Sequence, residues 1–223
     1  MKISVLGTGD VGRQLASKLV AVGHEVKLGS RTADNEKAAS WATDTGERAS
    51  HGTFADSAEF GEIVLNCTAG AVSLQVLESA GKGALAGKIL IDVSNPLDFS
   101  KGFPPFLSVC NTDSVGEQIQ AAFPDTKVVK TLNTVANHIM VDPSLVPGPH
   151  HLFVSGNDAE AKAEVTKLLK EAFGWQEVID LGDITTARGT EAWLLLWTRL
   201  FGALGSPDFN LAIVRKPADA SAG

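Results

Sequence analysis

The hydrophobic positions of the chain repeat with two alternating periods. The short apolar run of Ile3, Val5 and Leu6 is typical of a buried parallel strand, whereas Leu15 and Leu19 recur at helical spacing. The alternation continues to residue 204. The predicted strands cover 3–6, 25–28, 48–54, 62–66, 88–93, 127–131, 151–155 and 176–181. The predicted helices cover the stretch after the first glycines and 33–46, 72–80, 115–123, 158–173 and 184–204; 56–60 is predicted as a turn and 97–112 as a long loop.

Strands that alternate with helices at this spacing predict an α/β protein. The expected fold is a Rossmann-type, doubly wound, mostly parallel sheet with helices on both faces and a small C-terminal helical extension. We assign residues 1–182 to the Rossmann domain, 183–215 to the extension and 216–223 to a disordered tail. The helix over 184–204 has few polar residues, so we expect it to be deeply buried or to form half of the interface of a homodimer.

The turn after the first strand has the pattern Gly7-x-Gly9-x-x-Gly12. In a dinucleotide-binding fold the first glycine permits a sharp turn, the second lets the backbone approach a pyrophosphate, and the third allows close packing of helix on strand. The free N–H groups of the next helix then form an anion site. A plain βαβ turn without a ligand is the alternative. The predicted dinucleotide contacts are Gly7, Thr8, Gly9, Asp10, Val11 and Gly12.

The end of the second predicted strand indicates which dinucleotide binds. An NAD site places Asp or Glu about 20 residues after the glycines, where it binds the ribose 2′-hydroxyl. Here Ser30 and Arg31 occupy that position, and their hydroxyl and guanidinium suit a dianionic 2′-phosphate. Lys37 can add a positive contact, while Asp34 and Glu36 are expected to cap and start the next helix. We therefore predict NADP(H), with ordinary loop roles for Ser30 and Arg31 as the alternative.

Small, amide and hydroxyl residues follow several other predicted strands. The carboxyl ends of parallel strands meet at one edge of the sheet, where ligands bind. Such residues suit a flat nicotinamide ring, and turn roles are the alternative. The predicted cofactor contacts at these ends are Cys67, Thr68, Ala69, Asn95, Pro96 and Asn133, and the predicted substrate-side residues are Asn133, Asn137 and His138.

The composition argues against several kinds of chemistry. The 223 residues include no tyrosine, so the Tyr-x-x-x-Lys acid of the short-chain dehydrogenases is absent, and a net charge of −7 argues against nucleic acid as a partner. No histidine or cysteine has zinc-site spacing, so we predict no metal, and no histidine has a visible carboxylate partner. Two isolated cysteines, expected at buried positions, favour a reducing cytoplasm. No apolar run of about 18 residues and no charged leader is seen, so we expect neither membrane insertion nor export.

A hydride transfer between a nicotinamide and a flavin-like ring makes few demands on side chains. The two cofactors carry the chemistry, and the protein has to bring the rings into contact. A site of Gly, Ala, Thr, Asn and Pro suits that reaction better than it suits carbonyl reduction.

Six segments carry a family resemblance. They are Gly7-Thr-Gly-Asp-Val-Gly12, Gly29-Ser-Arg31, Ile91-Asp-Val-Ser-Asn-Pro96, Val129-Lys-Thr-Leu-Asn-Thr134, Phe153-Val-Ser-Gly-Asn-Asp158, and Ala187-Arg188 with Glu191. Together they resemble the deazaflavin (coenzyme F420)-dependent NADP oxidoreductases, and they are similar to the NADPH-binding domain of mammalian metalloreductases. The resemblance implies that Thr8, Ser30 and Arg31 contact NADP and that the segment from Asn133 faces a second redox ring.

The function that this resemblance implies is hydride transfer between NADP(H) and coenzyme F420 or a flavin. Asn133 stands where the archaeal deazaflavin enzymes carry His and the metalloreductase domains carry Asn, so the acceptor is left open. An NADPH-dependent flavin or ferric reductase and a non-enzymatic NADPH-sensing protein are the alternatives.

Overall fold

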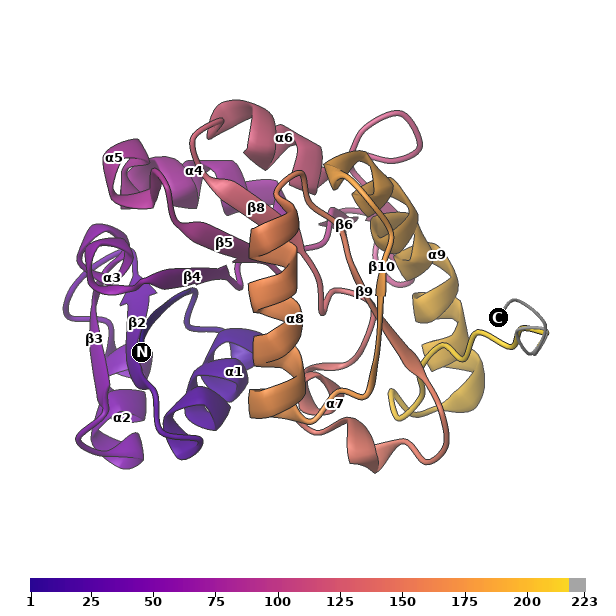
Figure 1. Ribbon diagram of the computed structural model, residues 1–223, viewed down its shortest axis with the longest axis horizontal. Helices are drawn as coiled ribbons and strands as arrows, with labels where there is room; N and C mark the ends of the chain where they lie inside the picture. The colour runs from indigo at the N-terminus through magenta and orange to yellow at the C-terminus, as the bar shows by residue number, and fades with distance from the viewer. Residues whose placement is uncertain (217–223) are drawn as a thin grey trace, which may run out of the picture.

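A six-stranded parallel sheet forms the centre of the molecule in the computed structural model, which describes residues 1–216 (Figure 1). In spatial order its strands are β3 (Ala49–Thr53), β2 (Glu25–Ser30), β1 (Lys2–Leu6), β4 (Ile63–Asn66), β5 (Ile89–Asp92) and β8 (Lys127–Lys130). Every neighbouring pair is parallel. The strand order reverses between β1 and β4, as it does in the Rossmann fold. The predicted α/β fold is confirmed.

Helices cover both faces of this sheet. One hydrophobic core packs under α1 (Asp10–Ala21), α2 (Glu36–Thr45), α7 (Asn137–Val141) and α8 (Ala159–Phe173). The other packs under α3 (Phe54–Phe60), α4 (Gly70–Ala80), α5 (Lys82–Leu85) and α6 (Val115–Ala122). Successive side chains of a strand point to opposite faces. Accordingly, Ile63 and Leu65 of β4 belong to the first core and Val64 to the second.

The chain after β8 forms a second, smaller sheet. The strands β9 (His151–Val154) and β10 (Glu177–Asp180) pair in parallel, with α8 as their crossover. An antiparallel bridge between Lys130 and Ser155 attaches this pair to the end of β8. The strands predicted at 151–155 and 176–181 therefore exist, but they do not continue the ladder of the central sheet.

The turn predicted over 56–60 is wrong, because this segment lies in α3. Thr53 accepts a hydrogen bond from the Asp56 N–H, and the Asp56 carboxylate accepts one from the Thr53 N–H. This reciprocal capping box starts a helix without a long apolar period. At α2 the cap is Asn35, whose side chain accepts from the Ala38 N–H, and not the expected Asp34.

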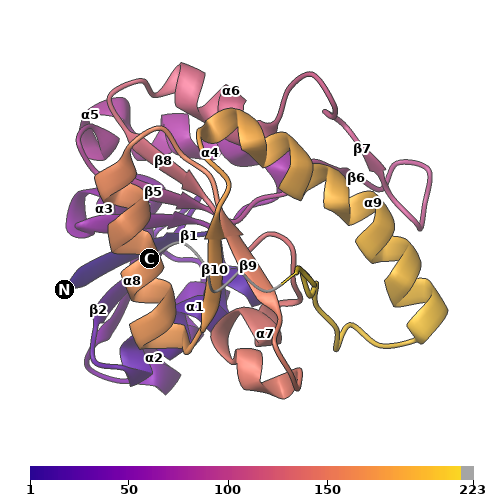
Figure 2. The same ribbon diagram turned by 45° about the vertical axis from the view of Figure 1, so that its right-hand side comes forward.

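The long loop predicted over 97–112 contains a short antiparallel hairpin. Its strands β6 (Leu97–Asp98) and β7 (Phe106–Leu107) lie beside the C-terminal helix (Figure 2). Cys110, expected at a buried position, is exposed in this loop. Three further short elements were not predicted, namely α5, α7 and the 3-10 turn η1 (Pro143–Leu145).

The predicted helix over 184–204 consists of a 3-10 turn, η2 (Ile184–Thr186), followed by α9 (Ala187–Leu204). Leu194 is buried, but Leu195, Leu196 and Leu204 are 44%, 53% and 61% exposed. Deep burial of the whole helix is therefore wrong, and its role in a dimer stays a prediction. Of the tail predicted over 216–223, only residue 216 belongs to the described part of the chain. Among residues 1–216, no helix has the length and apolarity needed to cross a membrane.

Candidate functional site

The glycine-rich turn lies between β1 and α1, and its three glycines meet different constraints. Gly7 has a left-handed φ of 115°. A Cβ at Gly12 would lie 2.0 Å from the Gly7 carbonyl oxygen, so only glycine permits this close packing. A Cβ at Gly9 would meet nothing within 4 Å, and Gly9 is exposed. The surface above Gly9 is thus free for a ligand that approaches the backbone.

The first turn of α1 is open to an anion. Its N-cap is Gly9, which has no side chain to bond the first N–H groups of the helix. Thr8 is half-buried beside this turn, and Asp10 is exposed and forms a 2.5 Å ion pair with Arg13. A pyrophosphate over Gly9 would face N–H groups and the positive end of the helix dipole.

The predicted 2′-phosphate residues lie at the carboxyl end of β2. Ser30 is buried, and its hydroxyl donates to the Thr32 carbonyl at 2.5 Å, which fixes the loop. Arg31 is exposed at the strand tip, and no carboxylate of residues 1–216 forms an ion pair with it. Lys37 lies in the first turn of α2 and lines a groove of about 760 Å³ between α1 and α2.

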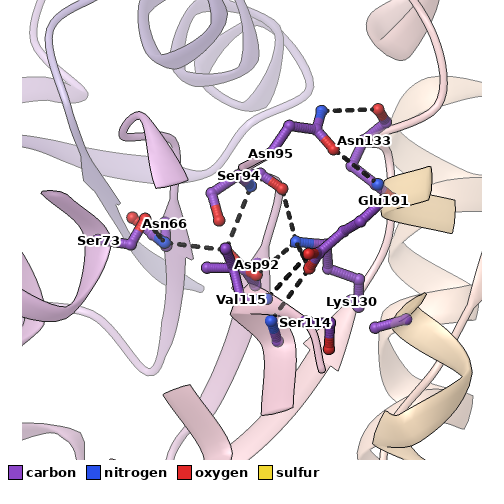
Figure 3. A network of polar contacts seen from close by, with 12 residues as sticks. Asn66, Ser73, Asp92, Ser94, Asn95, Ser114, Val115, Lys130, Asn133 and Glu191 are labelled. Atoms are coloured by element: carbon purple, nitrogen blue, oxygen red, sulfur yellow. Dashed lines mark hydrogen bonds and ion pairs between the residues drawn. The ribbon is translucent and has the colours of Figure 1, made fainter. Parts of the chain in front are cut away.

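A buried polar network lies beneath the ends of β4, β5 and β8 (Figure 3). The Lys130 ammonium contacts Asp92 and Glu191, each at 2.8 Å, and donates to the Ser94 carbonyl. Asp92 also accepts from the Asn66 amide at 2.9 Å. Burial acts to lower the pKa of Lys130, but the carboxylates of Asp92 and Glu191 outweigh it and raise that pKa above its ordinary value. Lys130 is therefore a fully buried cation.

This network positions the strand-end residues above it. Asn66 accepts hydrogen bonds from the backbone N–H and the hydroxyl of Thr68. Asn95 and Asn133 bond each other: the Asn95 amide donates to the Asn133 backbone carbonyl at 2.9 Å, and the Asn133 amide donates to the Asn95 side chain at 3.0 Å. The structure thus joins the loops after β5 and β8 through two predicted cofactor contacts.

A cavity of about 440 Å³ opens beside this asparagine pair and the start of α1. Its lining includes five predicted site residues: Asp10, Val11, Asn95, Asn133 and Asn137. The other lining residues are Val93, Val135, Ala136, Met140, Leu194, Trp197, Phe201 and Pro207. Trp197 stacks on Phe201 with ring centroids 5.7 Å apart, so α9 presents an aromatic wall.

The predicted residues Cys67, Ala69 and Pro96 do not line the cavity. Burial raises the pKa of the Cys67 thiol well above its usual range, so this side chain is a neutral packing group under the glycine turn. Ala69 is the N-cap residue of α4. Pro96 is buried, and its carbonyl accepts from the Ser108 N–H of the hairpin loop.

His138 has a carboxylate partner, contrary to expectation. Its Nε2 lies 2.6 Å from Asp208 Oδ1, in the segment that follows α9. Hydrogen bonds from Ser206 and His138 lower the pKa of Asp208. His138 does not line the cavity, whereas its neighbour Asn137 does and donates to Gln14 of α1. Within residues 1–216, no group of three His, Cys, Asp or Glu side chains could hold a metal ion.

Sequence reasoning missed two parts of the site. Lys130 ends an otherwise apolar strand, and its neighbours gave no sign that it is buried with two carboxylates. Trp197 was not among the predicted site residues, although its helical spacing from Leu194 and Phe201 places all three on the cavity wall. An unbroken apolar face on the last helix was the available signal.

The chain is similar to known NADP oxidoreductases. Residues 2–96 match the sequence profile of the family described as NADP oxidoreductase coenzyme F420-dependent. The F420-dependent NADP reductase of Methanothermobacter marburgensis is 30% identical over 203 residues, which cover 86% of this chain and 88% of the reductase. A solved structure from Arthrobacter sp. FB24, named as a candidate F420-dependent NADP reductase, is 53% identical, has a TM-score of 0.91 and covers 96% of this chain and 100% of its own.

The metalloreductase STEAP3 of Rattus norvegicus is 30% identical over 192 residues. That match covers 86% of this chain but 36% of the metalloreductase. The chain therefore spans about a third of this longer relative.

The glycine turn yields a paired prediction. Gly9→Ala should leave the fold intact, because its Cβ meets nothing, but should weaken NADPH binding at least tenfold by blocking the backbone approach, about 1.4 kcal/mol. Gly12→Ala should lower the free energy of unfolding by about 1–3 kcal/mol through overpacking against Gly7. Thermal unfolding and NADPH titration of both variants test this. Unchanged NADPH affinity in Gly9→Ala would contradict it.

Proposed function

Because the chain belongs to the family of coenzyme F420-dependent NADP oxidoreductases, we propose that it transfers a hydride between NADP(H) and a deazaflavin or flavin ring. The proposed place of transfer is the cavity beside Asn95 and Asn133. NADP(H), when bound, supplies or accepts the hydride. The protein binds the cofactor, holds the two rings in contact and keeps water from the apolar side.

The chemistry of the cavity lining carries this proposal. Of the lining residues in the described chain, only Asp10 is ionisable, and it is paired with Arg13 at the surface. Reduction of a carbonyl requires a positioned proton donor. Transfer between two rings requires a flat apolar surface, which Leu194, Trp197 and Phe201 supply. The volume of about 440 Å³ also lies in the usual range of small-molecule sites.

The two halves of NADP(H) are assigned to the two halves of the sheet. We place the 2′-phosphate at Ser30 and Arg31 after β2, the pyrophosphate over Gly9 and the nicotinamide beside Asn95 and Asn133. The amides of these two asparagines fix each other, so the loops that face the ring are held rigidly. The fit rests on the open Gly9 position and the uncapped start of α1.

The alternatives differ in what the cavity holds. A flavin or ferric reductase would use the same NADPH-binding residues, and the similarity to the metalloreductase STEAP3 supports this alternative. A sensor that binds NADPH without turnover would need no second space, whereas the cavity extends from Asn95 and Asn133 to Trp197 and Phe201. This space favours the enzyme. The cytoplasm stays our proposed compartment.

Direct transfer from labelled NADPH tests the proposed reaction. With deuterium at the nicotinamide C4, we expect label to appear on the ring of reduced coenzyme F420, read by mass spectrometry, with riboflavin, FMN and ferric ion as comparison acceptors. His138 does not line the cavity, so we expect His138→Gln to lower the rate by less than about a thousandfold. Loss of a general acid can lower a rate by as much as about ten-thousandfold. NADPH binding without reduction of any acceptor would favour the sensor. With coenzyme F420 as the acceptor, loss of label to solvent would exclude ring-to-ring transfer, because deuterium on a ring carbon does not exchange with water, whereas deuterium on the N5 of a reduced flavin does.

Cofactor selectivity tests the assignment of Arg31. The unaltered protein should bind NADPH at least tenfold more tightly than NADH, and Arg31→Ala should weaken NADPH binding about 10- to 150-fold by removing a charged hydrogen bond. Arg48→Ala is the matched control. Arg48 precedes β3, so it lies at the amino ends of the parallel strands, whereas Arg31 lies at their carboxyl ends. Equal titration curves for NADPH and NADH would sink the assignment.

We also propose the division into a Rossmann domain over 1–182 and a helical extension over 183–215, and a homodimer formed through α9. Leu195, Leu196 and Leu204 of α9 are exposed, as are Phe103 and Phe106 of the hairpin loop beside it. Light scattering at micromolar concentration should give twice the mass of the chain, and Leu196→Lys should shift it toward the monomer. A monomeric mass for the unaltered protein would refute the dimer.

A further inference from the structure

Lys130 touches groups that belong to opposite sides of the cavity. Its ammonium lies 2.8 Å from Asp92 on β5, 2.8 Å from Glu191 on α9 and 2.5 Å from the Ser94 carbonyl oxygen (Figure 3). The Lys130 and Asp92 side chains are fully buried, and Glu191 is nearly so. One cation therefore connects two strands, a strand-end loop and the C-terminal helix.

On one side, the cation fixes the loop that carries Asn95. The Ser94 carbonyl accepts from Lys130, and the Ser94 N–H donates to Asp92, so the backbone at this residue is held at both polar groups. Asn95 follows directly, lines the cavity and bonds to Asn133. A shift of Lys130 or Asp92 would move the part of the cavity lining that Asn95 forms.

On the other side, the cation fixes α9. Glu191 accepts from the N–H groups of Val115 and Gly116 at the start of α6, besides its contact with Lys130. Leu194 follows one helical turn later and lines the cavity, as does Trp197 after a second turn. The position of Glu191 therefore sets the position of the aromatic wall.

Burying the charges of this cluster costs free energy that a purely structural contact does not require. Two carboxylates and one ammonium leave a net negative charge inside the protein, which the N-terminal end of α6 offsets in part. Well-packed apolar residues often stabilise a fold as well as a buried ion pair does. What apolar residues cannot supply is a directional connection between Ser94 and α9.

We propose that Lys130 and Glu191 are positioning residues for the nicotinamide half of the cofactor site. Through them the Asn95 loop and the α9 wall keep a fixed separation, within which the nicotinamide ring lies against the Asn95 loop. The proposal rests on the proposed function in one respect, namely that this cavity holds the nicotinamide end of NADP(H). It predicts that loss of the Lys130–Glu191 contact affects the nicotinamide end and spares the adenosine end.

Two ligands separate the two ends without any redox acceptor. The first is NADPH, and the second is 2′,5′-ADP, which carries the adenosine and 2′-phosphate but no nicotinamide. In Glu191→Gln we expect the Kd of NADPH to rise about tenfold, or about 1.4 kcal/mol, while the Kd of 2′,5′-ADP stays within about twofold. Isothermal calorimetry measures both. Hydrogen exchange should also quicken over residues 93–96 in the ligand-free variant.

Glu117→Gln is the matched control. Glu117 also fastens α9 to α6, through a two-point contact with the Arg188 guanidinium, but it contacts none of the strand-end loops. Its substitution should leave both affinities and the exchange of residues 93–96 unchanged. If Glu191→Gln does not unfold cooperatively, Trp193→Phe replaces it, since the Trp193 indole donates to the Thr134 carbonyl and provides a second tie between α9 and the strand ends. We expect Trp193→Phe to raise the Kd of NADPH about two- to fivefold and to leave the Kd of 2′,5′-ADP unchanged.

Each outcome decides the proposal. An equal rise in the Kd of NADPH and the Kd of 2′,5′-ADP would show a general loosening of the fold and would overturn the proposal. Unchanged NADPH affinity in a folded Glu191→Gln protein would overturn it too. An unaltered protein that binds NADPH but reduces no acceptor would contradict the proposed reaction and leave this comparison intact.

Discussion

The buried ammonium of Lys130 is the contact on which the candidate site depends most. Lys130 is the last residue of β8, and its ammonium joins Asp92, Ser94 and Glu191 in one polar network. A buried cation that lost both carboxylates would be left without a compensating charge, typically at a cost of about 3–5 kcal/mol. The loops after β5 and β8 and the helix α9 are therefore constrained together and cannot move independently at low cost.

The site that results has polar groups below and apolar groups above. Amides and hydroxyls are anchored by the network at the strand ends, while Leu194, Trp197 and Phe201 form the facing wall. This separation suits two flat rings that exchange a hydride, because neither ring needs a proton donor from the protein. The adenosine half needs no comparable network. In the proposed binding mode, the exposed Arg31 and the open turn at Gly9 provide charge and space for that half.

Local sequence patterns predicted the central sheet, the glycine turn and most strand-end residues, because each depends on neighbours within a few positions. The helix α3 was missed because a capping box at Thr53 starts it and apolar spacing does not. The burial of Lys130 and the partner of His138 could not be predicted. Asp92 lies 38 residues from Lys130, and Asp208 lies 70 residues from His138. Such contacts depend on the crossing of distant elements, which no local pattern encodes.

A crystal structure with NADP⁺ and a deazaflavin or flavin bound together would test the central claim most directly. That claim is that the nicotinamide lies against the Asn95 and Asn133 loops while the second ring occupies the cavity under α9. The account predicts the two rings in face-to-face contact, with Leu194, Trp197 and Phe201 on the far side of the acceptor. An acceptor ring bound elsewhere, or a nicotinamide turned away from the two asparagines, would contradict it.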